Sequence, residues 1–249
     1  MGIKRRFHFK NDQRLSQKLN GLLGLWVGIS FSGLLIWNGI VGMPSQISSC
    51  NYPYPGNEAT INLKAGDTLC IPPGELFTGR IENLPKGALI RVNAQAMFQP
   101  IGIWNAKGSI DNYGLIVIDD QISTQGLGID NKGKIEIRHN PGNKADLNIL
   151  NRLGASINTS SNVSNLNSRI TLENYGDIYF EGKIRIGSKT KIENNGRINF
   201  EDFSTLNGSV SNFGIIQAYE KILISQQAKV QNHCSFIAPN SREFSEASF

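Results

Sequence analysis

Acidic and basic side chains that could cleave a polysaccharide gather in one short part of the sequence. Asp119 and Asp120 are adjacent, and Arg138 and His139 follow 19 residues later. A glycoside hydrolase needs two carboxyl groups that flank the sugar bond, and a lyase needs a base and a cation. Adjacent residues of a strand point to opposite faces, so at most one of the two aspartates faces a given groove. We therefore expect no catalytic site, with these four residues as the alternative.

A second set of carboxylates recurs at intervals, each directly before an asparagine. The set is Asp111, Asp130, Glu173 and Glu193. On adjacent turns of a coil these groups would repel one another unless cations intervene, and oxygen ligands of this kind suit Ca²⁺. Neutralising side chains are also near in sequence: Lys132, Lys134, Lys191 and Arg197. We favour neutralisation, because no Gly-Gly-x-Gly-x-Asp repeat is present, and expect no metal or other cofactor. Ca²⁺ at the four carboxylates is the alternative.

The asparagines after these carboxylates belong to a repeat with a period of about 20 residues. Its intact copies are centred on Asn112, Asn131, Asn174, Asn194, Asn212 and Asn232. The residue two before each asparagine is aliphatic, and the residues four and six after it are apolar in every copy. A degenerate copy centred on Asn151, with Gly154 and Ile157 displaced by one residue, fills the double-length gap between Asn131 and Asn174.

Apolar residues at even offsets indicate β-strands with one face inward, and a fixed period of this length is typical of a solenoid. The asparagine side chain points inward like its apolar neighbours, so its amide needs hydrogen-bond partners. We expect the amides of successive coils to stack at an Asn-x-Gly corner. Val92, Ala94, Ala96 and Phe98 match the same offsets, which predicts alanine at this corner in the first coils. The predicted fold is all-β: a single-stranded parallel β-helix of about nine coils over residues 60–240, preceded by one N-terminal transmembrane or signal helix.

The excess positive charge lies at the N-terminus. Residues 1–20 hold six basic side chains and one acidic side chain, which equals the net charge of +5. The rest is balanced, which removes the electrostatic basis for binding nucleic acid. No charged residue lies between Lys18 and Glu58, and residues 21–43 are long enough to span a membrane. We expect a cytoplasmic segment at 1–20 and a retained anchor or signal h-region at 21–43. A linker at 44–59 and a flexible tail at 241–249 complete the chain.

Three cysteines leave one unpaired in an exported chain. Cys50 ends an Ile-Ser-Ser-Cys stretch similar to a lipobox, so lipidation of Cys50 is one prediction, and a Cys50–Cys70 bond is the other. Cys234 replaces the glycine of the repeat, and we expect a small buried thiol there. The Ser- and Asn-rich segment from Thr159 to Ser168 is expected to bulge out as a loop.

The opening Ala-Gly-Asp-Thr-Leu-Cys-Ile-Pro-Pro-Gly at 65–74, followed by tandem Asn-x-Gly-x-Ile coils, carries a family resemblance. It is similar to the right-handed parallel β-helix repeats of bacterial exported surface and adhesin-like proteins. The resemblance implies an extracellular or envelope protein, commonly without catalysis.

The expected function is that of a non-catalytic cell-surface or envelope β-solenoid for adhesion, interaction or structural support. The alternative is a small pectate-lyase-like polysaccharide lyase or glycoside hydrolase, for which Trp104, Tyr113 and Tyr175 would be the sugar-stacking aromatics. The expected partners are the membrane, through residues 21–43, and surface glycans or other envelope proteins. We expect the β-helix outside the cytoplasm.

Overall fold

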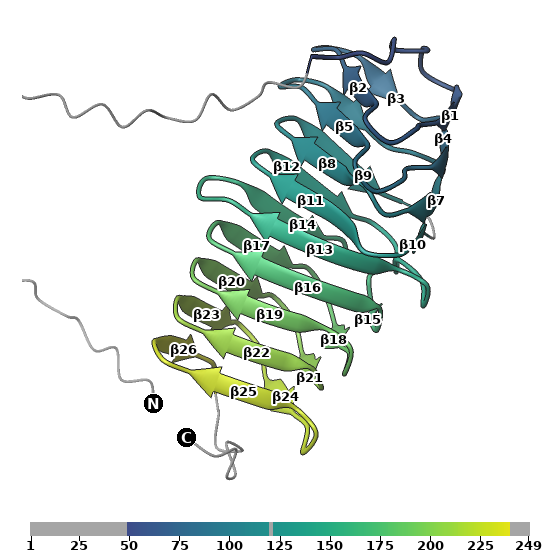
Figure 1. The fold of residues 1–249 in the computed structure, drawn as a ribbon. Helices are drawn as coiled ribbons and strands as arrows, with labels where there is room; N and C mark the ends of the chain where they lie inside the picture. The colour runs from purple at the N-terminus through teal and green to yellow at the C-terminus, as the bar shows by residue number, and fades with distance from the viewer. Residues whose placement is uncertain (1–48, 120–121, 240–249) are drawn as a thin grey trace, which may run out of the picture. The chain divides into compact units, whose positions relative to one another are not determined.

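The computed structural model describes residues 49–119 and 122–239, and the regular secondary structure of these residues is β-strand (Figure 1). The strands form a stack of nine coils, which confirms the predicted all-β parallel solenoid. The predicted N-terminal helix lies outside the described residues, as do Asp120 and the tail at 241–249. Within the described part of the chain, no helix has the length and apolar character to cross a membrane.

Two nine-stranded parallel sheets run the length of the stack, and each coil contributes one strand to each of them. The first sheet contains β2 (Thr68–Ile71), β5 (Leu89–Val92), β8 (Ser109–Asn112), β11 (Leu127–Asn131), β13 (Asp146–Asn151), β16 (Arg169–Asn174), β19 (Lys191–Asn194), β22 (Ser209–Asn212) and β25 (Lys229–Asn232). The second sheet contains β3 (Leu76–Phe77), β6 (Met97–Phe98), β9 (Leu115–Ile118), β12 (Lys134–Ile137), β14 (Ser156–Thr159), β17 (Asp177–Phe180), β20 (Arg197–Phe200), β23 (Ile215–Ala218) and β26 (Ser235–Ile237).

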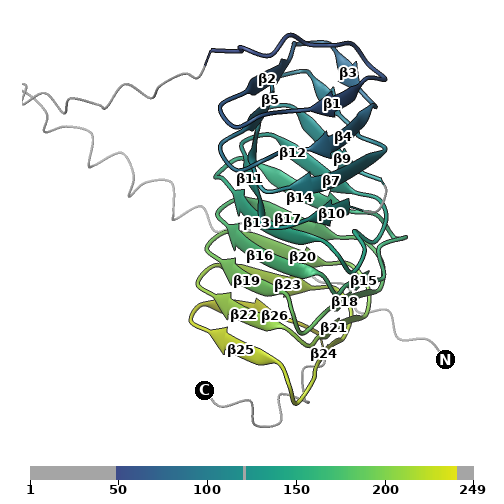
Figure 2. The same cartoon turned by 45° about the vertical axis from the view of Figure 1, so that its right-hand side comes forward.

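The remaining side of the stack is divided between two four-stranded sheets (Figure 2). The third sheet contains β1 (Thr60–Asn62), β4 (Arg80–Asn83), β7 (Gly102–Ala106) and β10 (Ile122–Thr124). The fourth contains β15 (Asn165–Leu166), β18 (Ile184–Ile186), β21 (Ser204–Leu206) and β24 (Ile222–Ile224). Between them, residues 138–145 form no strand. Pro141 lies in this segment and has no N–H to donate to a ladder.

The predicted loop at Thr159–Ser168 is wrong in part. This segment contains β15, whose Leu166 pairs with Ile186 of β18 and is buried. It therefore starts the fourth sheet, because Leu166 supplies the inward apolar residue that a strand on this side of the coil needs.

The core is the inside of the coil, where each strand places alternate side chains. Strand β20 shows the pattern, with Ile198 and Phe200 buried and Asn199 half-exposed between them. Like residues stack on like: the Phe180 and Phe200 rings lie 4.9 Å apart, and the Phe77 and Phe98 rings 5.5 Å apart. Each such side chain stabilises the fold by about 1.5–3 kcal/mol through burial.

Asparagine amides connect seven successive coils at the corner between the first and second sheets. Each Nδ2 donates to Oδ1 of the next asparagine at 2.7 Å, in the order Asn112, Asn131, Asn151, Asn174, Asn194, Asn212 and Asn232. All but Asn232 are fully buried. Nδ2 also donates to a backbone carbonyl of the following coil, as from Asn174 to Arg197 at 3.2 Å. The buried amides are therefore satisfied as they must be.

The glycine two residues after the asparagine allows the coils to approach closely. A Cβ placed on Gly196 would collide with the backbone carbonyl oxygen of Gly176 in the preceding coil, and one on Gly214 with that of Gly196. The next position in this column is Cys234, in the last described coil, and its side chain is exposed. The expected burial of this thiol is wrong, because no described coil covers that face.

The predicted alanine at the corner of the first coils is also wrong. Val92 pairs with Asn112, and Ile71 pairs with Val92, so aliphatic residues occupy the asparagine column there. The cause is a longer turn. Met97, which pairs with Leu115, lies five positions after Val92, whereas Leu115 lies only three positions after Asn112. Asn151 keeps its predicted place in the ladder. The turn after it is two residues longer than the turn after Asn131, whereas the sequence predicts a displacement of one residue.

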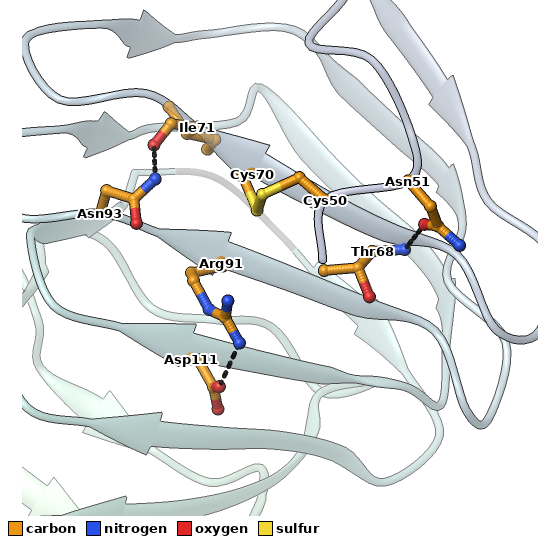
Figure 3. The surroundings of a disulfide bond; sticks show 8 residues. All are labelled: Cys50, Asn51, Thr68, Cys70, Ile71, Arg91, Asn93 and Asp111. Atoms are coloured by element: carbon orange, nitrogen blue, oxygen red, sulfur yellow. Dashed lines mark hydrogen bonds and ion pairs between the residues drawn. A yellow bond between two sulfur atoms is a disulfide. The ribbon is translucent and has the colours of Figure 1, made fainter. Parts of the chain in front are cut away.

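Residues 50–54 pack on the first coil through several contacts (Figure 3). Cys50 forms a disulfide with Cys70 of β2. Asn51 accepts a hydrogen bond from the Thr68 backbone N–H at 2.6 Å and donates to the Gly66 carbonyl oxygen at 3.0 Å. Tyr52 and Tyr54 pack against the core. This end of the stack is therefore covered by the chain's own residues.

Candidate functional site

The residues of the alternative catalytic site, Asp119, Arg138 and His139, meet at the ends of β9 and β12. These strands pair in register, so the residues after Ile118 and Ile137 lie side by side. Asp119 Oδ1 lies 2.9 Å from His139 Nδ1, and Gln99 Nε2 donates to Asp119 Oδ2 at 3.1 Å. Both carboxylate oxygens of Asp119 are thus engaged by neighbours. Asp120, the fourth predicted residue, lies outside the described residues.

An open hollow of about 490 Å³ adjoins this pair and is also lined by Glu136 and Glu181. Glu136 accepts from Lys134 Nζ at 2.7 Å and from Arg138 at 2.9 Å. The hydrogen bond from Lys134, supported by that from Arg138, lowers the pKa of Glu136 against the opposing effect of burial. A general acid in a glycosidase has a raised pKa. The pKa of Glu136 is shifted in the opposite direction, which favours its deprotonated form.

The acidic column on the outer face of the first sheet is interrupted and partly paired with cations. Asp111 pairs with Arg91 at 3.8 Å (Figure 3). Asp130 pairs with Lys132 at 3.1 Å and with Arg152 at 2.8 Å. Burial by itself would raise the pKa of Asp130, but the hydrogen bonds from Arg152 and Lys132 lower it below its ordinary value. The ion pairs with Lys132 and Arg152 therefore stabilise the Asp130 carboxylate as an anion.

Leu150 interrupts the acidic column. It pairs with Asp130 on one side and with Glu173 on the other, so these two carboxylates lie two coils apart. Glu173 and Glu193 are paired neighbours on β16 and β19. The Tyr175 hydroxyl donates to Glu173 at 2.6 Å, and this bond raises the pKa of the Tyr175 phenol. Among the described residues, no group of three or more His, Cys, Asp or Glu side chains is arranged to hold a metal ion.

The neutralising cations are only partly those expected. Lys132 pairs with the acidic column, whereas Lys134 pairs with Glu136 instead. Sequence reasoning missed Arg91 and Arg152. Arg152 follows the degenerate Asn151 copy at the same offset at which Lys132 follows Asn131, and this shared offset is the signal that could have identified it.

Two of the three candidate sugar-stacking aromatics have a ring face covered by a cation. The Arg80 guanidinium lies 5.2 Å from the Trp104 ring centroid, and Lys132 Nζ lies 4.6 Å from that of Tyr113. Tyr175, the third, is 40% exposed. On the same corner, Phe213 and His233 stack along the coil direction at 4.6 Å. These contacts join neighbouring coils.

The sulfur of Cys50 is part of the disulfide with Cys70. A thioether-linked lipid would need the same atom, so the disulfide-bonded and lipidated forms of Cys50 exclude each other. The described geometry is that of the predicted Cys50–Cys70 pairing.

These features define the class of the protein as a parallel β-solenoid with ion-paired surface columns. Comparison of the chain with protein-family models, with curated proteins and with solved structures finds no match.

Proposed function

We propose that this protein is an exported, non-catalytic β-solenoid of the bacterial cell envelope or cell surface, acting as an adhesion, interaction or structural module. Its partners are surface glycans or other envelope proteins, and residues 21–43 attach it to the membrane. The alternative remains a small polysaccharide lyase or glycoside hydrolase.

The observation that carries the proposal is the pairing of the acidic side chains at the alternative catalytic position. Asp119 is bonded to His139 and Gln99, and Glu136 to Lys134 and Arg138. A hydrolase needs one carboxyl that holds a proton near neutral pH and a second that faces the bond. The pKa of Glu136 is lowered, which disfavours it as the acid.

The Cys50–Cys70 disulfide supports export, because disulfides persist in oxidising compartments outside the cytoplasm. The balanced charge of the chain after residue 43 supports a partner other than nucleic acid.

Cys234 provides a test of export, because it is an exposed free thiol of the solenoid. Cells that express the full chain are treated with a charged maleimide that does not cross the cytoplasmic membrane. We expect labelling in intact cells, and none in a Cys234→Ser variant. Labelling that appears only after lysis would contradict the proposed location.

Catalysis is tested separately on the purified full chain. We expect no release of reducing ends and no unsaturated products from pectate, xylan or cellulose, with or without Ca²⁺. Turnover that is lost in Asp119→Asn and kept in Asp111→Asn would establish the enzymatic alternative.

A further inference from the structure

A polar groove runs along the corner between the fourth sheet and the first sheet, over the last four coils. It has a volume of about 420 Å³. Its lining residues are Asn165, Asn167, Arg185, Gly187, Ser188, Asn207, Ser225, Gln226 and Gln227. Strands β15, β18, β21 and β24 stack in register along this side (Figure 2). Three of these four coils therefore place a polar residue directly after the strand, and the remaining coil has Gly187 at this position.

The lining has an unusual chemical composition. It contains five amide side chains, two hydroxyls and one guanidinium, with neither a carboxylate nor an apolar side chain larger than glycine. Each amide offers two donors and one acceptor, and each hydroxyl offers one donor and two lone pairs. This composition differs from the hollow beside Asp119, where carboxylates and cations neutralise one another.

Two buried atoms of the lining have no hydrogen-bond partner among the described residues. They are Asn165 Oδ1 and Ser225 Oγ. Buried polar atoms in folded proteins are nearly always paired, and one without a partner in its own chain calls for water, an ion or a ligand. Asn165 and Ser225 both line the groove. Rotation of either side chain toward the groove would let a hydrogen-bonding ligand satisfy its unpaired atom.

The amides of this groove also contrast with those of the asparagine ladder. Side chains of Asn167, Asn207, Gln226 and Gln227 make no hydrogen bond with any residue that the structure describes. In the ladder, every amide bonds to the next coil where one is described. The groove amides therefore have no structural role that hydrogen bonding would explain.

We propose that this groove binds a hydroxyl-rich saccharide chain lying along the coil axis. Vicinal hydroxyls pair with an amide through one donor and one acceptor, and coils repeat about every 4.7–4.9 Å, which offers a polymer hydrogen-bonding side chains along its length. A phosphate or sulfate site would present several cations, whereas Arg185 is the only charged side chain in the lining. A peptide side chain would need an apolar pocket, which this lining does not provide. The inference rests on the proposed role as a binding module.

The test uses the purified full chain on an array of neutral oligosaccharides from cellulose, xylan, mannan, starch and chitin, with galacturonan oligomers as the carboxylated arm. Binding to the best oligosaccharide is then measured by calorimetry. We expect the Asn207→Leu/Gln227→Leu variant to bind about tenfold more weakly, because several hydrogen bonds are lost together. Asn148→Leu, an exposed amide of β13 outside the groove, should bind as the wild type.

Ser225→Ala separates binding from stability. The Ser225 hydroxyl has no partner in the described structure, so its removal should leave the melting temperature unchanged or raise it while binding weakens. A groove variant that binds the array hit normally would overturn the inference and leave the proposed function standing. Absence of any array binding, or saturable binding of inorganic sulfate that Arg185→Gln abolishes, would also overturn it. Export and the lack of turnover are measured independently of all these outcomes.

Discussion

Replacement of Asn174 by valine tests whether the asparagine ladder is a continuous stabilising element. Asn174 is fully buried. It accepts from Asn151 at 2.7 Å and donates to Asn194 at 2.7 Å and to the Arg197 carbonyl at 3.2 Å. Valine is a suitable replacement because Val92 already occupies this column in the second coil.

The expected cost follows from these three bonds. Each contributes about 1 kcal/mol net, and buried partners left unsatisfied add about 1–3 kcal/mol. Valine burial offsets about 1–2 kcal/mol. We therefore expect Asn174→Val to lower the free energy of unfolding by about 3–4 kcal/mol. Asn112 starts the ladder and lacks only the hydrogen bond from an earlier coil, so Asn112→Val should cost about 1 kcal/mol less.

Urea unfolding of the full chain, followed by circular dichroism, measures the midpoint and the slope for each variant. Asn195→Val serves as the control outside the ladder, because this half-buried asparagine adjoins the ladder and its side chain makes one weak hydrogen bond at 3.4 Å. Its effect should stay within about 0.5 kcal/mol. Equal effects of the Asn174 and Asn112 substitutions, or a neutral Asn174→Val, would refute the idea that the amides act as a connected chain.

Three further predictions concern the glycine column, an ion pair and the disulfide. Gly196→Ala should destabilise by about 1–3 kcal/mol through a clash with the preceding coil; Gly128→Ala, whose Cβ would lie 3.8 Å from its nearest neighbour, should be neutral in the same unfolding assay. The pKa of Asp130 is lowered in the folded state, so its contribution is present above its unfolded pKa of about 3.9 and is lost as pH falls through the folded value. Asp130→Asn should therefore cost about 1 kcal/mol or less at pH 7 and less at pH 2, and an equal cost at both pH values would contradict the ion-pair account. The Cys50–Cys70 bond closes a loop of 20 residues, so dithiothreitol should lower stability by about 3 kcal/mol, with no effect on a Cys50→Ser/Cys70→Ser chain.

Much of the fold could be predicted because its determinants are local and repeated. Inward residues such as Ile178, Ile198 and Ile216 recur at one offset in each copy, and a period of two identifies a half-buried strand wherever it stands. The long turns could not be predicted in the same way. Two extra residues after Val92 preserve the alternating pattern, so the sequence reads equally well in the wrong register.

The candidate sites depended more heavily on the tertiary structure. Asp119 and His139 could be selected by residue type, and the one-coil separation brings them together. Their engagement by neighbours such as Gln99 follows from side-chain positions that the repeat does not specify. The polar groove gave no motif, because its residues come from four coils and their type changes from coil to coil, as from Asn167 to Gly187 and Ser225.

The sequence by itself determined the coil: its period, its inward columns and the asparagine corner, since burial acts on every copy alike. Only the tertiary structure decided which cation neutralises which carboxylate and which cysteine of the three remains free. Those outcomes depend on distances between side chains on different coils, and turn lengths set these distances one coil at a time. Cys234 stands in the column of close contacts but is exposed, because it lies on the last described coil.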